Sequence, residues 1–302
     1  MHESTLRRVQ DALKKSGYQL DPVVSAGMSR IRQRRFYRET LAWCGDYPPE
    51  TIPWLEPFFR SMESYCARLG YAVEYFHFAK ATPRELARLA SIWRARGIRG
   101  VLLGPFRTGH TELPFPWDDL AWVVIGQALK SPVLHSVVRD YATDIRAALE
   151  WLRARGCKRP GFVHEADVRH LFSTAMMQEA GAYYRGKTPR DFEPYLECDR
   201  AKPEMLIKWL AANRPDGLVI GRPFRNLRPA LEKAGLDMPV VSLSPPEIEG
   251  CREEVYFVAR YDVLGQSAVS LLHRLLMNRE FGLPAYKQTV ALSSVFHRPA
   301  EP

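Results

Sequence analysis

From Thr40 onward, short apolar runs alternate with longer amphipathic stretches, and this alternation restricts the possible folds more than any other feature of the sequence. The apolar runs are of strand length and predict strands at Leu41–Trp43, Val73–Phe78, Gly100–Leu103, Trp122–Ile125, Arg159–Val163, Gly217–Ile220 and Val240–Leu243. The stretches between them predict helices at Trp54–Leu69, Pro83–Arg96, Thr143–Arg155, Phe172–Tyr184, Lys202–Ala212, Leu227–Ala234 and Val263–Met277. Strands that alternate with helices form parallel sheets covered by helices on both faces.

Glycine follows several predicted helices directly, as in RLGY at 68–71 and KAGLDM at 233–238, which is typical of helix C-termini. The strands are too numerous for one small sheet, and 302 residues are enough for about two domains. We therefore predict an α/β fold with two similar doubly wound lobes of parallel sheet.

The first 35 residues differ from the rest of the chain in pattern and in charge. Apolar positions at helical spacing predict an amphipathic helix over Glu3–Ser16, and Pro22 suits the first turn of a short helix over Val23–Arg30. The segment contains eight basic and three acidic residues, so it carries +5 of the net charge of +9. Charge alone leaves two interpretations open: a contact with a polyanion such as DNA, or a solvated helix face with a linker.

Several classes of protein are not expected. No apolar run approaches the ~20 residues of a membrane helix, and the chain opens with a charged amphipathic stretch rather than a secretory signal, so we expect a cytoplasmic protein. Five scattered cysteines without a CxxC pair indicate neither a disulfide scaffold nor a zinc ribbon. Without a recognisable nucleophile, base or cofactor motif, we expect neither an enzyme nor a cofactor. His164, Glu165, Asp167 and His170 form the one polar cluster suited to a metal, but such loop residues are more often solvated, so no metal is expected.

Six segments, in order along the chain, resemble one protein family. They are Glu3–Arg35, EPFFRSMESYCARLGYAVEYF from Glu56, RDYATDIRAALEWLRARGCKRPGFV from Arg139, RPDGLVIG from Arg214, LEKAGLDMPVVSL from Leu231 and YDVLGQSAVSLLHRLLMNREFGLP from Tyr261. Together with their order, these segments resemble the LacI/GalR family of transcriptional regulators over nearly the whole chain. The resemblance implies a periplasmic-binding-protein-like core of two lobes, preceded by a short helical N-terminal segment.

The resemblance also implies a division of the chain and a set of partners. Residues 1–35 correspond to a partial DNA-binding head-piece with a hinge helix, and residues 36–302 to an effector-binding core. Within the core, the N-lobe is expected at about 36–137 plus 262–285, and the C-lobe at about 138–261 plus 286–302. The implied partners are a sugar-like or sugar-acid-like effector, an operator DNA and a second copy of the chain. The residues expected to contact DNA are Met28, Arg30, Arg32, Arg34 and Arg35. For the homodimer, we expect the face of the Trp54–Leu69 helix that carries Phe59 and Met62 to be exposed.

This sequence departs from the family pattern at several places. The head-piece helices that precede the Glu3–Ser16 helix in the family, including the recognition helix, have no counterpart, and Gly27 stands where the family has a bulky residue that enters the minor groove. The polar sugar contacts of typical members are replaced by Gly221-Arg222 and Ser244-Pro245, and a glutamine by Ala259. Two explanations remain open: an unusual effector, such as an anionic one bound by Arg169 and Arg222, or a pocket that no longer senses a ligand.

Ligands of such folds bind beyond the carboxyl ends of the parallel strands. Aromatic faces and charged groups near those ends suit a sugar, because rings stack on C–H patches and charges bind hydroxyls. The candidates are Asp46, Trp54, Phe58, Phe106, Asp167, Arg169, Arg222, Ser244 and Tyr261. Core packing is the alternative for the aromatic residues, and a surface ion pair for Asp167 and Arg169. We thus predict a regulator that couples effector binding to operator binding; the alternative is a stand-alone solute-binding protein.

Overall fold

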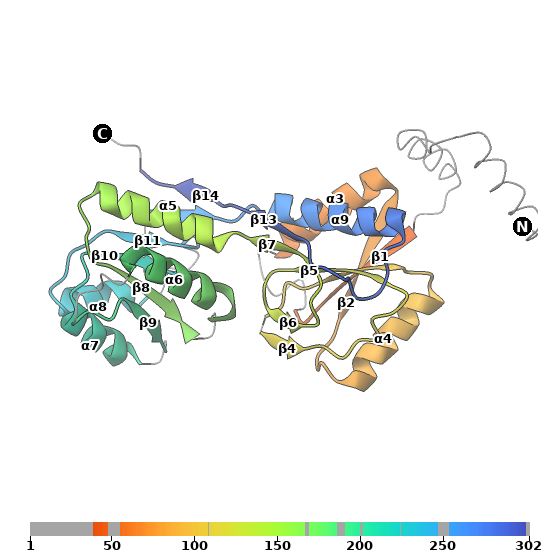
Figure 1. The fold of residues 1–302 in the computed structure, drawn as a ribbon, viewed down its shortest axis with the longest axis horizontal. Helices are drawn as coiled ribbons and strands as arrows, with labels where there is room; N and C mark the ends of the chain where they lie inside the picture. The colour runs from red at the N-terminus through yellow and green to blue at the C-terminus, as the bar shows by residue number, and fades with distance from the viewer. Residues whose placement is uncertain are drawn as a thin grey trace, which may run out of the picture. The chain divides into compact units, whose positions relative to one another are not determined.

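The computed structural model describes residues 39–47, 55–107, 109–166, 169–185, 191–199, 202–223, 225–246 and 254–299. The expected DNA contacts (Met28, Arg30, Arg32, Arg34 and Arg35) and the two predicted N-terminal helices lie outside these residues. Thr40–Pro302 form one compact unit. In the described part of the chain, two large, mostly parallel sheets each form the centre of a lobe (Figure 1).

The N-lobe sheet is built from strands that lie far apart in the sequence. Its strand order is β13 (Thr289–Leu292), β7 (His135–Arg139), β5 (Ala121–Ile125), β3 (Gly100–Leu103), β1 (Glu39–Gly45) and β2 (Tyr71–His77). From β13 to β1 all neighbours are parallel. Every residue of β3, β5 and β7 is buried, which is why these strands lack the polar alternation of a half-exposed sheet.

Helices cover both faces of the N-lobe sheet (Figure 1). The helices α3 (Leu55–Leu69) and α9 (Tyr261–Asn278) pack against each other and against the face that carries Leu41 and Trp43. The helix α4 (Pro83–Ala95) packs against the opposite face, to which Ala42 and Cys44 point. A short parallel pair, β4 (His110–Glu112) and β6 (Leu129–Ser131), lies beside this layer.

The C-lobe repeats the same plan. Its strand order is β14 (Val295–His297), β12 (Tyr256–Val258), β11 (Val240–Ser242), β10 (Gly217–Ile220), β8 (Pro160–Glu165) and β9 (Tyr195–Cys198). Among these strands, β14 alone is antiparallel to its neighbour. The helices α5 (Tyr141–Ala154) and α6 (Arg169–Tyr184) cover the face that carries Phe162. The helices α7 (Pro203–Asn213) and α8 (Leu227–Lys233) cover the face that carries Val163.

The prediction of two doubly wound α/β lobes is confirmed, and each predicted strand and helix from Thr40 onward corresponds to an element, apart from shifts at its ends. One lobe boundary differs from the prediction. We placed 286–302 in the C-lobe, but β13 pairs with β7 of the N-lobe, so the chain returns to the C-lobe only after Leu292. The reason is that β13 (TVAL) is half exposed at a sheet edge and does not form a marked apolar run.

Two expectations for α3 are wrong. Phe58 was predicted to contact a ligand and Met62 to lie on an exposed dimer face, but both side chains are fully buried in the N-lobe core. Gly265 of α9 explains this burial, because a Cβ there would lie only 2.8 Å from Cγ of Met62 and 3.4 Å from the ring of Phe58. The two helices therefore approach closely at this glycine, and the face that carries Met62 is covered by α9.

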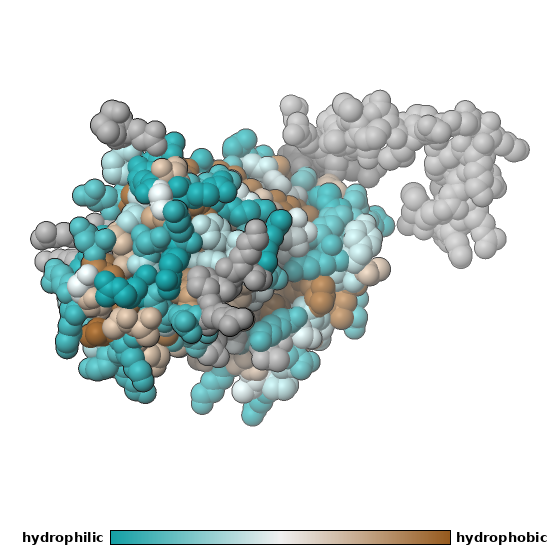
Figure 2. Space-filling model, turned by 60° about the vertical axis from the view of Figure 1, so that its left-hand side comes forward, coloured by the Kyte–Doolittle hydropathy of each residue, from teal (hydrophilic) through white to brown (hydrophobic). Residues whose placement is uncertain are grey.

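The surface in Figure 2 is mostly hydrophilic, with hydrophobic residues in small groups, which is normal for a globular protein. No helix in the described ranges is long and apolar enough to cross a membrane.

Because Phe58 is a core residue, Phe58→Ala is expected to lower the free energy of unfolding by about 3–5 kcal/mol. Chemical denaturation followed by circular dichroism measures this change. Met177→Ala, at a side chain that is 57% exposed, is the control and should change stability by less than about 0.5 kcal/mol. Unchanged stability of the Phe58 variant would contradict its assignment to the core.

Candidate functional site

The strand order reverses once in each lobe. In the N-lobe the chain proceeds from β1 to β2 on one side and to β3 on the other. In the C-lobe the same reversal occurs at β8, between β9 and β10. In doubly wound sheets, ligands bind outside the carboxyl ends of the strands at such a reversal. The residues that follow β1, β3, β8 and β10 are therefore the candidate site.

At the N-lobe reversal, Asp46 holds the loop that follows β3. One carboxylate oxygen accepts a hydrogen bond of 2.7 Å from the backbone N–H of Arg107, and the other lies 3.2 Å from Nε2 of His110. The ring of His110 packs edge-on against Phe106, with 4.9 Å between ring centroids. Asp46, predicted as a ligand contact, thus also organises this edge of the lobe.

Phe106, also predicted as a ligand contact, is only 3% exposed and belongs to the core on the α4 side of the sheet. The backbone places it there, because Gly104 has φ +81 and turns the chain back at the end of β3. A Cβ at Gly104 would lie 2.9 Å from the carbonyl oxygen of Ile125, so the position has no room for a side chain. Phe106 is therefore a core residue under the loop that follows β3. Core packing was the alternative given for the aromatic candidates in the sequence analysis.

Tyr47 follows Asp46 and is half-buried. Burial, with a smaller effect from the negative charge of Asp46, raises the pKa of the Tyr47 hydroxyl to about 12, although the positive charges of Arg107 and Arg222 oppose the shift. The phenol therefore stays neutral near pH 7 and can both donate and accept a hydrogen bond.

At the C-lobe reversal, Glu165 and Arg222 form an ion pair. Nε of Arg222 donates a hydrogen bond of 2.6 Å to the carboxylate of Glu165. The side chain of Glu165 is 2% exposed, whereas that of Arg222 is 29% exposed. Such a pair fixes the direction of the guanidinium and leaves part of it accessible to a ligand. Arg222 was predicted as a ligand contact, and Glu165 is the partner that the prediction lacked.

A second polar network lies directly behind this pair. The buried ring of His164 places Nδ1 2.9 Å from the backbone carbonyl oxygen of Glu165, and its Nε2 hydrogen-bonds with the hydroxyl of Tyr195. The carboxylate of Glu197 lies 3.9 Å from the same nitrogen. These contacts stiffen the end of β8 and so position Glu165. Within the described residues, no three or more His, Cys, Asp or Glu side chains are grouped so as to hold a metal ion.

Gly221, directly before Arg222, has no room for a side chain. A Cβ at this position would lie 2.9 Å from the ring of Phe172 and 3.1 Å from Cβ of His164. A polar side chain at this position therefore requires Phe172 to move. Phe172 also packs edge-on against Tyr141, with 4.9 Å between centroids.

The remaining predicted ligand contacts are placed as follows. Ser244 is half-buried after β11, and its backbone N–H and carbonyl both bond to the hydroxyl of Ser242. Tyr261 begins α9 and packs against the N-lobe core while remaining partly exposed. Arg169 begins α6, and its side chain is not among those described. Trp54 and Asp167 lie outside the described residues.

A buried ion pair lies where the chain passes between the lobes. In the described part of the chain the backbone does so after β7, after β12 and after β13. Asp144 of α5 is 1% exposed and accepts a hydrogen bond of 2.8 Å from Nε of Arg139 at the end of β7. The same carboxylate accepts bonds from the backbone N–H (3.0 Å) and hydroxyl (2.7 Å) of Ser294, which follows β13. One carboxylate thus joins two of the connections.

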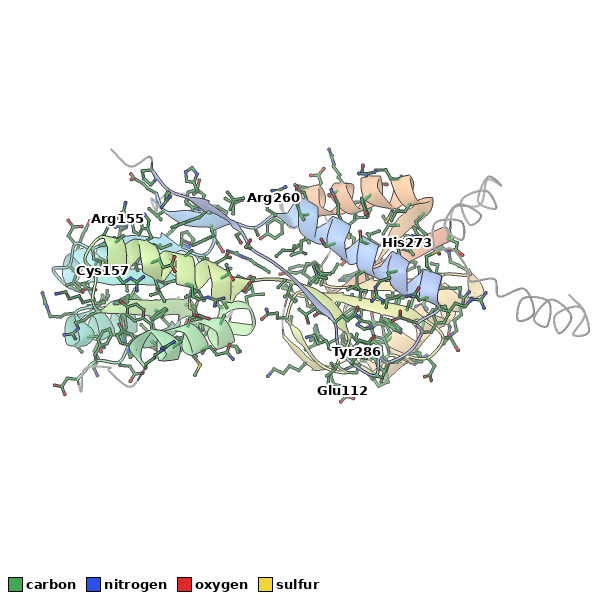
Figure 3. All side chains as sticks on the ribbon, turned by 45° about the horizontal axis from the view of Figure 1, so that its top comes forward. Glu112, Arg155, Cys157, Arg260, His273 and Tyr286 are labelled. Carbon is green, nitrogen blue, oxygen red and sulfur yellow. The ribbon has the colours of Figure 1, made fainter. Side chains whose placement is uncertain are left out.

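The third connection carries a more exposed ion pair. Arg260, at the start of α9 (Figure 3), donates hydrogen bonds of 3.0 and 2.8 Å to the carboxylate of Asp262. These bonds lower the pKa of Asp262. Both side chains are about half exposed, so this pair contributes little to stability.

Asp144→Ala is expected to lower the free energy of unfolding by about 3–5 kcal/mol, because it leaves the buried guanidinium of Arg139 without its carboxylate partner. Glu74→Ala is the matched control, since it removes an exposed ion pair with Arg96 and should cost less than about 1 kcal/mol. Urea denaturation compares the two. Equal, small costs would mean that Asp144 is not a structural link between the connections.

No protein-family model matches the sequence, and no curated protein sequence matches it either. Solved structures do match. A regulatory protein of the LacI family from Chloroflexus aggregans is 16% identical with a TM-score of 0.65, covering 87% of this chain and 98% of its own. A LacI family transcriptional regulator from Enterococcus faecium with bound ribose is 15% identical with a TM-score of 0.59, covering 86% and 97%.

A third structure belongs to the same group. A periplasmic binding protein/LacI transcriptional regulator from Alkaliphilus metalliredigens, complexed with D-xylulofuranose, is 14% identical with a TM-score of 0.55 and covers 87% of this chain and 100% of its own. At these identities the likeness is one of fold. The part of the chain that the structure describes therefore has the fold of the periplasmic-binding-protein-like effector domain of LacI-family regulators, as the sequence resemblance predicted.

Proposed function

We propose that this protein is a sugar-sensing transcriptional regulator of the LacI type, without enzymatic activity. The observation that carries the proposal is the placement of Asp46 and Tyr47 at one strand-order reversal and of Glu165 and Arg222 at the other. In this fold, such positions face a ligand. Two of the similar structures hold a pentose, which supports a sugar as the ligand class.

The chemistry of these groups favours a neutral or singly charged polyhydroxylated molecule. Carboxylates accept hydrogen bonds from sugar hydroxyls, and the guanidinium of Arg222 donates to their oxygens. The Arg222 charge is largely compensated by Glu165, because their atoms are 2.6 Å apart. A neutral sugar therefore suits the site better than a multiply charged anion, and a sugar acid remains the second candidate.

Coupling to DNA would proceed through the connections between the lobes. A ligand that binds both reversal points favours one arrangement of the lobes over others, and so shifts a population of states. The basic segment 1–35, with Arg30, Arg32, Arg34 and Arg35, supplies phosphate contacts, and a homodimer brings two such segments to one operator. Because Met62 is covered by α9, the dimer contact is expected to use other residues.

Ligand binding is tested by thermal shift against pentoses, hexoses and their acids. A ligand at 100 times its dissociation constant should stabilise the protein by about 2.7 kcal/mol. Arg222→Ala should then weaken binding of that ligand by about 1.5–3 kcal/mol, the contribution of a charged hydrogen bond. Arg96→Ala, which removes an exposed arginine paired with Glu74, serves as the control and should bind normally. Equal affinity of both variants would remove Arg222 from the site.

DNA binding separates the regulator from the alternative, a stand-alone solute-binding protein. We expect the 302-residue chain to bind DNA through phosphates, weakly and with little sequence preference. If each segment makes about four contacts, raising salt from about 50 to 200 mM should reduce the affinity of a dimer on the order of 10⁴-fold. Fluorescence anisotropy with an A·T-rich and a G·C-rich duplex measures this dependence.

The control for this titration is a variant with Arg30, Arg32, Arg34 and Arg35 changed to Gln, which should lose most of the salt dependence. No DNA binding by the wild-type chain even at low salt would favour the solute-binding protein. Tight, salt-resistant binding to one duplex alone would show that the segment itself reads base sequence, through Met28 in the minor groove for example.

A further inference from the structure

A cavity lies beside the amino-terminal ends of two N-lobe strands, β5 and β7, away from the carboxyl ends where the candidate site lies. Its volume is about 360 Å³, within the usual range of small-molecule pockets. It is lined by Trp122 at the start of β5, by His135 at the start of β7 and by the loop between α9 and β13. Tyr286 of that loop is labelled in Figure 3. None of the residues considered above as ligand contacts lines this cavity.

The loop that closes the cavity is held at both ends. The backbone N–H of Gly282, at φ +79, donates a hydrogen bond of 2.8 Å to the carbonyl oxygen of Leu120. At the other end, the carbonyl oxygen of Gln288 accepts a bond of 2.9 Å from the N–H of Ser136. Directly before Gly282, the ring of Phe281 packs against the guanidinium of Arg99, whose central carbon lies 4.4 Å from the ring centroid. These contacts within the protein hold the loop that closes the cavity.

One polar group in the cavity wall has an unused hydrogen-bonding atom. His135 is 5% exposed, and its Nδ1 accepts a hydrogen bond of 3.1 Å from the N–H of Gln288. The proton of the neutral ring must then be on Nε2. Among the described residues, Nε2 of His135 has no hydrogen-bond partner. Burial, and the nearby charge of Arg274, lower the pKa of His135, which agrees with a neutral ring.

The rest of the wall is mostly apolar, with the aromatic rings of Trp122, Phe281 and Tyr286 beside the aliphatic Leu275 and Leu283. The indole N–H of Trp122 already donates 2.8 Å to the carbonyl oxygen of Trp117, so its ring contributes an apolar face. Glu280, the acidic residue of the wall, is paired with Arg274 at 3.0 Å. Leu283 and Tyr286 on the loop are 51% and 67% exposed.

We propose that this cavity is a second ligand site, which binds a small, neutral, planar aromatic molecule with one hydrogen-bond acceptor. The acceptor, an amide carbonyl or a ring nitrogen, meets the Nε2–H of His135, and the ring packs against Trp122, Phe281 and Tyr286. A sugar suits the site less well, because the many hydroxyls of a sugar would find a single side-chain donor without a partner in this wall. The site is independent of the sugar-binding function proposed above.

The test uses benzamide as the probe and the full 302-residue chain, with ligand-observed NMR to detect binding and to measure the dissociation constant. We expect binding in the millimolar range or tighter, as for fragments of this size. Tyr286→Ser, at a position that is 67% exposed, should weaken benzamide binding by about 3- to 10-fold. His135→Phe, which keeps an aromatic ring but removes the donor, should weaken it by about 5- to 10-fold.

Two controls locate the binding. Met177→Ser, at an exposed methionine of the C-lobe, and Arg222→Ala, at the sugar site, should both bind benzamide as the wild type does. No binding of benzamide by the wild type at 10 mM would overturn the proposal. Wild-type affinity in both the Tyr286 and the His135 variants, or loss of binding in Arg222→Ala, would overturn it as well. None of these results depends on whether a sugar binds at the reversal points.

Discussion

The reversal of strand order in two parallel sheets is the constraint on which the rest of this structure depends. In each lobe, the chain leaves the reversal point on opposite sides, so the loops after the two strands diverge, and doubly wound sheets bind ligands between such loops. Asp46 and Arg107 follow the two strands at the N-lobe reversal, and Glu165 and Arg222 those at the C-lobe reversal. Residues far apart in the sequence become neighbours only because every one of these strands ends at the same edge of its sheet.

The charged groups at these edges are satisfied within the protein, and this determines what they can do. Asp46 and Glu165 each bind a neighbouring loop or side chain, so they act as rigid parts of the lobes. A site built this way is ready to bind a ligand with few changes of its own, which lowers the entropic cost of binding. The buried carboxylate of Asp144 has a similar role at the connections between the lobes, because it binds both Arg139 at the end of β7 and Ser294 after β13.

The sequence was sufficient to predict the elements that have strong patterns. β3 and β10 were predicted residue for residue, because they are short apolar runs with glycine at the start. The half-exposed edge strands β13 and β14 have no such pattern, and the lobe boundary was misplaced for that reason. Asp46 and Arg222 were predicted as ligand contacts because they are polar residues that follow strands.

The burial of Phe58, Met62 and Phe106 could not be predicted from sequence patterns. Periodicity shows that α3 has an apolar face, but not that α9, from the other end of the chain, covers Met62. Periodicity also could not predict the pairing of Arg222 with Glu165, because local patterns do not show which loops meet in the fold. The cavity beside His135 was missed for the same reason, because its wall combines two strand ends with a loop that follows α9.

The central claim is that one ligand contacts the strand-order reversal points of both lobes. Hydrogen–deuterium exchange, measured with and without the sugar that stabilises the protein most, tests it directly. The account predicts slower exchange in the loop after β3, at Gly104–Arg107, together with the segment after β10, at Gly221–Arg222, and at both to a similar extent. Slower exchange in one lobe alone, or in neither, would contradict it.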